Sequence, residues 1–148
     1  MKPIDSVFRA AAYAVGAIAS IMLVGCASGP KFSEYHQTAP PCPAGQGRIW
    51  FYRPAAAAAA VQPDVKLDGR VVGKAVPHGF FSADTTPGAH EVSATTEWTH
   101  KKQITVMPNC ESYVQLNMTM GLFVGHIVPE EVPPEKALRK IENLHLAQ

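Results

Sequence analysis

From residue 47 onward, apolar and polar residues alternate over short runs, and turn-forming residues interrupt these runs at close intervals. Alternation with a period of two puts successive side chains on opposite faces of a β-strand. The two clearest runs each give one shared face, made of Val92, Ala94, Thr96 and Trp98 in the first and of Val114, Leu116, Met118 and Met120 in the second. About seven such strands with tight turns predict a mainly β fold, an antiparallel β-sandwich, rather than a parallel α/β sheet.

The pair Asp68-Gly69 stands between two apolar runs and predicts the turn of a β-hairpin. Asp-Gly supplies the positive φ angles that a two-residue type I′ turn needs. The predicted register sets Leu67 opposite Arg70 and Val65 opposite Val72, which places the three apolar side chains on one buried face.

A second turn is predicted at Pro87-Gly88, because proline and glycine suit the two central positions of a type II turn. His90 stands two residues later, and we expect its ring to form hydrogen bonds that fix this turn. Both turn pairs are therefore assigned structural roles.

The C-terminal part of the chain changes to helical spacing. The sequence Pro133-Pro134-Glu135 predicts a helix start, because proline is favoured in the first turn and an acid suits the helix dipole there. Four apolar residues then recur at helical spacing: Ala137, Leu138, Ile141 and Leu144. A helix of about ten residues must pack on the domain to persist, so we expect it to cover one face or edge of the sandwich.

Trp50 and Tyr52 share one face of the predicted strand 48–53, and Arg48 and Arg53 stand at its two ends. We expect the two aromatic side chains to pack beneath the C-terminal helix. The alternative is an exposed aromatic and basic face, which would mark an interaction surface.

Two apolar segments lie outside the alternating pattern. Six alanines run from Ala55 to Ala60, too few for an isolated helix, and we expect a mobile loop there. The alternative is an apolar loop that touches a membrane or a partner. Residues 121–128 are expected to form a connection buried beneath the helix, with the lip of a peptide-binding or lipid-facing groove as the alternative.

The N-terminus carries the most specific motif of the chain. Lys2 and Arg9 precede an uncharged, mostly apolar run over residues 10–24. This run is shorter than the ~20 residues that a membrane-spanning helix needs, and its basic start is typical of a secretory signal peptide. It ends in Leu23-Val24-Gly25-Cys26, which resembles the lipobox of bacterial lipoproteins.

The lipobox resemblance implies a division of the chain into three segments. Residues 1–25 are expected to be a signal peptide that is removed, and Cys26 is expected to carry the lipid that anchors the protein in the membrane. Residues 26–46, rich in Pro, Gly and Ser, are expected to be an extended tether, and residues 47–148 the domain. Because Ala27 rather than Asp follows the cysteine, the resemblance implies the outer membrane, facing the periplasm. The alternative is a transmembrane anchor that happens to end in a cysteine.

The domain itself reads G-R-I-W-F-Y-R-P over residues 47–54 and P-D-V-K-L-D-G-R-V-V-G over residues 63–73. These stretches resemble an uncharacterised family of bacterial lipoproteins in the domain-of-unknown-function series. The second stretch, with P-G-A-H over residues 87–90, is also similar to PEGA domains, small β-sandwich modules of surface proteins. The resemblance implies an Ig-like or PEGA-like sandwich with one short C-terminal helix in the cell envelope. It implies no activity, ligand or catalytic residue.

Two cysteines, Cys42 and Cys110, remain beside Cys26. Two thiols in an oxidising periplasm can pair, and this pair would close a loop of about 69 residues, worth roughly 4 kcal/mol. Two free thiols, or bridges between molecules, are the alternatives.

Several functions are disfavoured by composition and spacing. The 13 Lys and Arg residues balance 12 Asp and Glu residues, whereas a nucleic-acid binder should carry a basic patch. No metal site is predicted, because no pair among the six histidines has the spacing H-x-x-x-H: His36, His78, His90, His100, His126 and His145. No serine stands in a G-x-S-x-G elbow, and no Gly-rich phosphate loop precedes a helix. We therefore predict neither a cofactor nor an enzymatic activity.

These observations favour a lipid-anchored envelope protein whose β-sandwich is a non-catalytic binding or structural domain. Its expected partners are the membrane, through the lipid, and an envelope protein, peptidoglycan or a polysaccharide. One alternative is an envelope enzyme whose dispersed residues meet only in the fold. Another is an accessory factor in envelope assembly or in the response to envelope stress.

Overall fold

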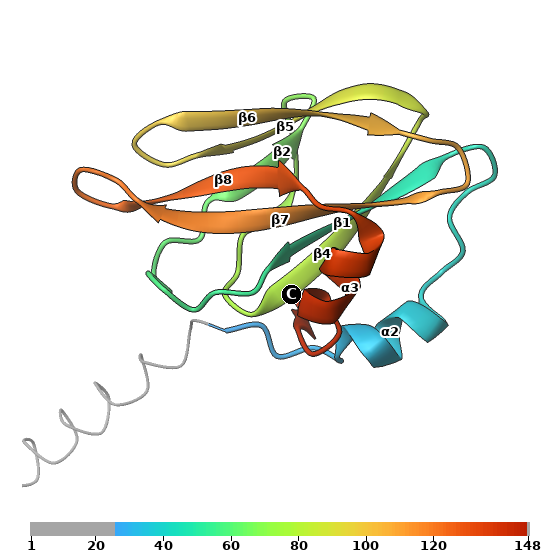
Figure 1. Ribbon diagram of the computed structural model, residues 1–148, viewed down its shortest axis with the longest axis horizontal. Coiled ribbons are helices and arrows are strands. Elements are labelled where there is room, and N and C mark those ends of the chain that lie inside the picture. The colour runs from blue at the N-terminus through green and yellow to red at the C-terminus, as the bar shows by residue number, and fades with distance from the viewer. Residues whose placement is uncertain (1–25, 148) are drawn as a thin grey trace, which may run out of the picture.

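The computed structural model describes residues 26–147, so the predicted signal peptide over residues 1–25 lies outside the described part of the chain. Nine strands and two helices form within it (Figure 1). In chain order they are α2 (Phe32–Thr38), β1 (Gly47–Arg53), β2 (Asp64–Leu67), β3 (Arg70–Lys74), β4 (Gly79–Thr85), β5 (Gly88–Thr95), β6 (Thr99–Val106), β7 (Glu111–Met120), β8 (Gly125–Glu131), α3 (Pro134–Ile141) and β9 (His145–Leu146).

The strands form two sheets that face each other, which confirms the predicted mainly β sandwich. The five-stranded sheet has the order β8-β7-β1-β4-β9, and the four-stranded sheet has the order β3-β2-β5-β6. Most neighbouring strands pair antiparallel. Two pairs are parallel, β1 with β7 and β4 with β9, which the prediction of a purely antiparallel sandwich did not include.

The main hydrophobic core lies between the two sheets. It is built from alternate residues of the facing strands, as a period of two requires. Its buried members are Ile49, Phe51, Val65, Leu67, Ala75, Phe81, Val92, Ala94, Ile104, Val106, Val114, Leu116 and Ile127. The predicted inward faces of the runs 91–98 and 113–120 are therefore correct over their first halves.

A second core lies on the outer face of the five-stranded sheet, where α2 and α3 cover it (Figure 1). Trp50 and Tyr52 lie at its centre and are fully buried, which confirms that they pack beneath the C-terminal helix. The helices contribute Phe32 from α2 and Ala137 and Ile141 from α3. Strand β1 is consequently buried on both faces and forms the middle of the molecule.

Helix α3 begins at Pro134, with Glu135 in its first turn, in agreement with the predicted start. Ala137 and Ile141, four residues apart, face the sheet, while Leu138 points outward and is 41% exposed. A helix of eight residues is too short to be stable alone, so the buried pair holds it in place.

The extended tether predicted for residues 26–46 is wrong over α2. Phe32, Tyr35 and His36 stand at helical spacing and form one aromatic face. The Phe32 ring meets the rings of Trp50 and Phe80 edge-on, with centroids 5.0 and 5.2 Å away. This aromatic face, hidden among Pro, Gly and Ser residues, folds the segment onto the domain.

The Asp68-Gly69 hairpin forms, with φ angles of 50° and 80° and Leu67 paired with Arg70. The predicted pairing of Val65 with Val72 is wrong, because a bulge between Val65 and Lys66 moves Val65 opposite Gly73. The ring of Phe81 lies over Gly73, where a Cβ atom would come within 2.6 Å of it. Glycine is therefore required at this point of the hairpin.

The predicted inward faces fail at the ends of two strands. Strand β5 stops at Thr95, so Trp98 lies in the following turn and is half exposed. Met120 ends β7 and is 83% exposed. The connection predicted to be buried over residues 121–128 is a tight turn into strand β8, and the side chains of Leu122 and Phe123 point into solvent.

Candidate functional site

Four connections gather at one end of the sandwich, on the left in Figure 1. They meet there because β1 and β7 run parallel and both end at this point, while β4 and β8 begin beside them. The β5–β6 turn lies at the same end, in contact with the start of β8. We call this region the loop end and define it by residues 54–63, 75–78, 96–98 and 121–124.

Arg53 fixes the alanine run of the loop end from inside. Its guanidinium is fully buried and donates from Nη1 to Val61 O (2.6 Å) and Ala75 O (2.7 Å). Its Nη2 donates to Ala57 O (2.6 Å) and Ala58 O (3.2 Å). Desolvation by burial lowers the pKa of Arg53, and within residues 26–147 no carboxylate forms an ion pair with it. Carbonyl oxygens therefore replace a counter-ion.

The alanines from Ala55 to Ala60 lie in the loop between β1 and β2, and these hydrogen bonds attach the backbone of that loop to Arg53, while its mobility stays a prediction. Small alanine side chains let the backbone approach the guanidinium, and Ala58 takes a left-handed φ of 50° to do so. The loop also touches the start of β8, because a Cβ atom on Gly125 would lie 3.4 Å from Ala58 Cβ. Sequence reasoning missed the role of Arg53, although an arginine at the end of an apolar strand is a signal of it.

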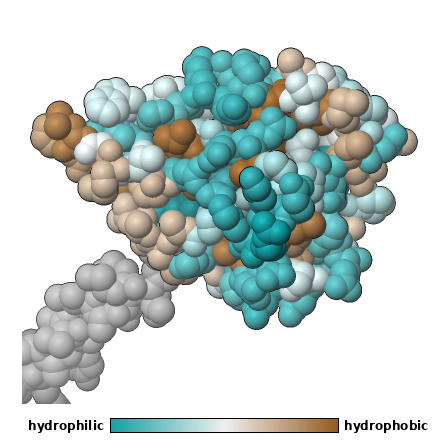
Figure 2. Space-filling view, viewed as in Figure 1, coloured by the Kyte–Doolittle hydropathy of each residue, from teal (hydrophilic) through white to brown (hydrophobic). Residues whose placement is uncertain are grey.

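Large apolar side chains are exposed at the loop end. They are Trp98, Met120, Leu122, Phe123 and Val124, with Phe123 84% exposed. Figure 2 shows the corresponding brown and tan surface gathered at the left-hand tip of the molecule, over the β7–β8 turn. Contiguous exposed apolar surface on a monomer marks an interaction site.

The two turns that carry these side chains support each other through His126. Its ring is buried, stacks on Trp98 with centroids 4.7 Å apart, and hydrogen-bonds through Nδ1 to Thr96 Oγ1 at 2.6 Å. Glu97 accepts a hydrogen bond from Val124 N at 3.2 Å. The apolar tips are therefore held in fixed positions relative to the sandwich.

The described chain begins at the loop end as well. Cys26 is exposed, and the next residue donates from Ala27 N to Pro77 O at 3.4 Å. Gly29 N donates to Leu146 O at 3.1 Å, and His145 Nδ1 lies 2.7 Å from Gly29 O. The predicted lipidation site is consequently fixed beside residues 75–78.

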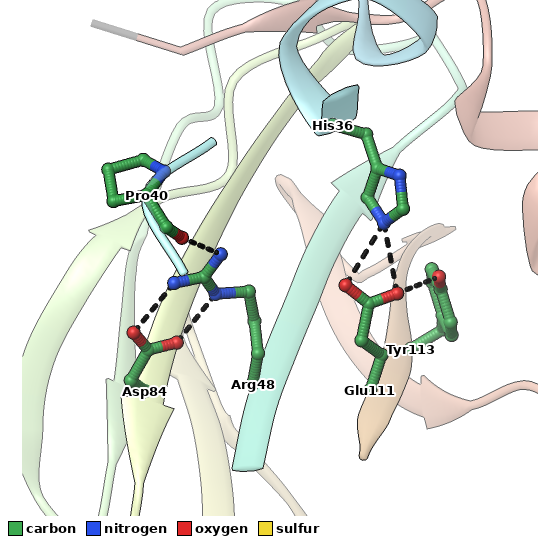
Figure 3. Close-up of polar contacts among 6 residues, drawn as sticks. All are labelled: His36, Pro40, Arg48, Asp84, Glu111 and Tyr113. Atoms are coloured by element: carbon green, nitrogen blue, oxygen red, sulfur yellow. Dashed lines mark hydrogen bonds and ion pairs between the residues drawn. The ribbon is translucent and has the colours of Figure 1, made fainter. Parts of the chain in front are cut away.

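The opposite end of the sandwich carries a polar cluster, shown in Figure 3. His36 Nε2 lies 3.0 Å from both carboxylate oxygens of Glu111, and Tyr113 OH donates to the same carboxylate at 2.8 Å. Desolvation raises the pKa of Glu111, but donors on Trp50, His36 and Tyr113 outweigh it, so the pKa lies below its usual value. The indole N–H of Trp50 contributes to the lowered pKa of Glu111, although it forms no hydrogen bond in the structure. The cluster attaches α2 to β1 and β7.

Arg48, which the sequence offered for a binding face, is mostly buried in the same region. It pairs with Asp84 across the β1–β4 ladder, Nε to Oδ1 at 2.6 Å and Nη2 to Oδ2 at 2.8 Å (Figure 3). Its Nη1 donates to Pro40 O at 2.8 Å. The hydrogen bond to Asp84 raises the pKa of Arg48. The alternative of an exposed aromatic and basic face is therefore wrong, because all four of its side chains are packed or paired.

Cys42 and Cys110 both lie near Arg48 and are free thiols in the structure. Arg48 N donates to Cys110 O at 3.0 Å, and Asp84 lies close to Cys42. Desolvation and Asp84 raise the pKa of the Cys42 thiol, which favours its protonated form. The bridge between the two cysteines stays a prediction.

His90 joins the two predicted turns. Its Nδ1 lies 2.6 Å from Asp68 Oδ2 and its Nε2 2.7 Å from Thr86 O, while Glu91 N donates to Asp68 Oδ1. A carbonyl and a carboxylate only accept hydrogen bonds, so the ring donates from both nitrogens and carries a positive charge. Gly88, beside Pro87, has a φ of 134°, which favours glycine.

Residues 26–147 contain no group of three or more His, Cys, Asp or Glu side chains placed to hold a metal ion. Neither helix in this part of the chain is long and apolar enough to cross a membrane.

Comparison with known proteins gives one match. The family described as "Protein of unknown function (DUF2846)" matches residues 43–127, which include β1 through β7 and the start of β8. Neither the curated proteins nor the solved structures gave a match. Since the matched region is more than half of the 148 residues, the chain belongs to the DUF2846 family of proteins of unknown function.

Proposed function

We propose that this protein is a lipid-anchored component of the bacterial cell envelope and that its β-sandwich is a non-catalytic binding or structural domain. The observation that carries the proposal is the sequence Leu23-Val24-Gly25-Cys26 at the end of a basic and then apolar N-terminal segment. That order of segments is typical of an exported protein, and two or three acyl chains on one cysteine anchor a protein stably.

The arrangement of Cys26 supports the anchor. The cysteine is exposed, so its thiol is accessible for acylation. It lies at the loop end, beside residues 75–78, and not at the end that carries the polar cluster of Glu111. Ala27 at the following position favours the outer membrane, with the domain in the periplasm.

The non-catalytic role is supported by the way the reactive side chains are used. Glu111 and His36 have the chemistry of an acid–base pair, yet their contacts hold α2 on the sheet. Asp84 neutralises Arg48, and Asp68 and His90 tie two turns together. Each of these groups has a structural partner that explains its position, so we propose binding to an envelope protein, peptidoglycan or polysaccharide in place of catalysis.

The test of this proposal is the intact mass of the protein extracted from membranes. We expect a chain that starts at Cys26 and carries the mass of its acyl groups. Cys26→Ser should remove that mass and release the protein from the membrane fraction. The matched control is Cys110→Ser, an exposed cysteine of the domain, which should keep the lipid. A full-length, unacylated wild-type chain would refute the proposal.

A further inference from the structure

We infer that the loop end of the sandwich rests in the surface of the lipid bilayer that anchors Cys26, with the β7–β8 turn and Trp98 inserted among the headgroups and upper acyl chains. The ligand is thus a phospholipid surface, bound through apolar insertion. This inference deepens the lipid anchoring proposed above and rests on it.

The first argument is that only a very short segment separates the lipidated cysteine from the folded domain. Within the described chain, Ala27 already hydrogen-bonds to Pro77, and Gly29 hydrogen-bonds to Leu146 and His145. One residue spans at most about 3.6 Å, so a lipid on Cys26 keeps the loop end next to the headgroups. An extended spacer of the kind predicted from the sequence would have let the domain stand away from the membrane.

The second argument is the chemistry of the exposed side chains. Leu122 and Phe123 form the tip of the β7–β8 turn and are among the most exposed large apolar residues of residues 26–147. Transfer of such surfaces from water to acyl chains is favourable. Trp98 lies on the neighbouring turn, and tryptophan is enriched at the membrane–water interface. The loop end therefore combines side chains suited to the acyl-chain region, Leu122 and Phe123, with one suited to the headgroup region, Trp98.

The third argument is the distribution of charge. Residues 54–63 and 119–125 contain no Asp, Glu, Lys or Arg. The acid in the β5–β6 turn, Glu97, is turned back onto the protein, where it accepts a hydrogen bond from Val124 N. Glu97 Oε2 also lies 3.5 Å from His126 Nε2, and the pair Asp64 with Lys74 lies where β2 begins and β3 ends. The opposite end carries Arg48, Asp84 and Glu111, so the loop end is the less charged of the two ends.

The fixed geometry of the loop end favours a lipid surface over a protein groove. Its apolar side chains project from separate turns, and His126 beneath them keeps the turns in register. Arg53 fixes the alanine run beside them, so the small side chains of Ala56 and Ala57 face outward on the same end. An apolar surface built from several turns suits a fluid lipid layer, which can adapt to its shape.

The experiment uses the two tryptophans of the chain as internal probes. Trp50 is fully buried, whereas Trp98 is half exposed at the loop end. The lipidated mature protein purified from membranes is reconstituted into phosphatidylcholine vesicles with brominated acyl chains, which quench tryptophans in contact with them. We expect brominated lipid to reduce the emission of the wild type markedly, and Trp98→Phe to abolish that reduction because only Trp50 remains.

Two further variants locate the contact. The double substitution Leu122→Ser with Phe123→Ser should reduce the quenching of Trp98 at least two-fold, because the insertion that holds it is lost. Met107→Ser is the matched control, since Met107 is exposed at the opposite end, just after β6, and should leave quenching unchanged.

The outcomes separate this inference from the proposed function. An acylated protein that floats with the vesicles while Trp98 stays unquenched overturns the insertion and leaves the lipid anchor intact. Equal quenching in the double variant also overturns it, as does chemical crosslinking of two copies through the β7–β8 turn, which would make a second copy the occupant. A chain without acyl mass that does not float refutes the anchor and the insertion together.

Discussion

His90 and Asp68 are 22 residues apart in the sequence, yet His90 Nδ1 lies 2.6 Å from Asp68 Oδ2, and this contact joins two turns. The second ring nitrogen holds the Thr86 carbonyl of the other turn. This bridge closes one end of the four-stranded sheet, and it depends on a charged imidazole in a largely buried position.

The first prediction concerns the pH dependence of stability through His90. The hydrogen bond to Asp68 raises the pKa of His90, so its stabilisation is complete below an ordinary histidine pKa of ~6.5 and is lost as pH rises through the raised value. The same contact lowers the pKa of Asp68, and that stabilisation is lost only as pH falls through the lowered value, below its ordinary 3.8.

We therefore expect His90→Gln to lower the free energy of unfolding by about 1–2 kcal/mol at pH 6, a modest effect because Asp68 is half exposed and partly screened by solvent. The loss should be smaller at pH 9, because the wild-type ring is then less often charged. Urea unfolding at the two pH values measures this difference. His78→Asn, an exposed histidine at a left-handed φ that asparagine tolerates, is the control. A constant penalty at both pH values would contradict the charged bridge.

The second prediction concerns Arg53 and the alanine run. Arg53→Met should cost about 3–5 kcal/mol, because it removes a fully buried guanidinium and leaves the buried carbonyl of Ala75 and three part-buried carbonyls without this donor. Elastase, which cleaves after small residues, should then cut the loop between Ala55 and Ala60 in the variant and spare the wild type. Arg70→Met, at an exposed arginine of β3, should change neither stability nor cleavage. Equal cleavage of both proteins would show that Arg53 does not fix the loop.

The third prediction concerns Glu111 and the docking of α2. The lowered pKa of Glu111 means that its stabilisation is present above ~4.5 and is lost as pH falls through the folded-state value. Glu111→Gln should speed hydrogen exchange in Phe32–Thr38 and cost about 0.5–1.5 kcal/mol at pH 7.

Glu131→Gln, an exposed acid on β8, serves as the control for that experiment. The variant Glu111→Gln also addresses the alternative of an envelope enzyme. If a cellular function were lost in Glu111→Gln while α2 stayed protected from exchange, the carboxylate would have a role beyond holding the helix.

The fourth prediction concerns Cys42 and Cys110. In protein isolated from an oxidising compartment we expect a bridge between them, detected as a gain of two hydrogen masses on reduction. Closure of about 69 residues would add roughly 4 kcal/mol to stability, which Cys110→Ser should remove. Native-state alkylation of both thiols in the oxidised protein would contradict the bridge.

The strands, the Asp68-Gly69 hairpin and α3 could be predicted because their signals are local. Period-two alternation, a turn pair and a proline-initiated helix each depend on neighbouring residues alone. Trp98 was misplaced for the same reason, since the alternating pattern continues past the last paired residue of β5, Thr95, into the turn. Met120 is still paired, with Gly125, but it lies at the exposed end of β7. No local signal marks the residue at which pairing stops.

Other parts of the structure depend on contacts between distant residues. Helix α2 is seven residues long and exists through its rings against Trp50 and Phe80. The four carbonyls that surround Arg53 come from backbone atoms, which carry no side-chain signature. The loop end as an apolar surface likewise emerges only when the topology brings four connections together.

The position of β1 between β4 and β7 sets the order in which the chain can complete its fold. Its partner β7 lies more than 60 residues further along, so the central strand stays half-paired until most of the domain has been synthesised. Contacts of such long sequence separation slow folding. For a protein exported as proposed, this delay would keep the chain unfolded while it passes through a translocation pore. The domain would then fold only after its C-terminal strands have crossed.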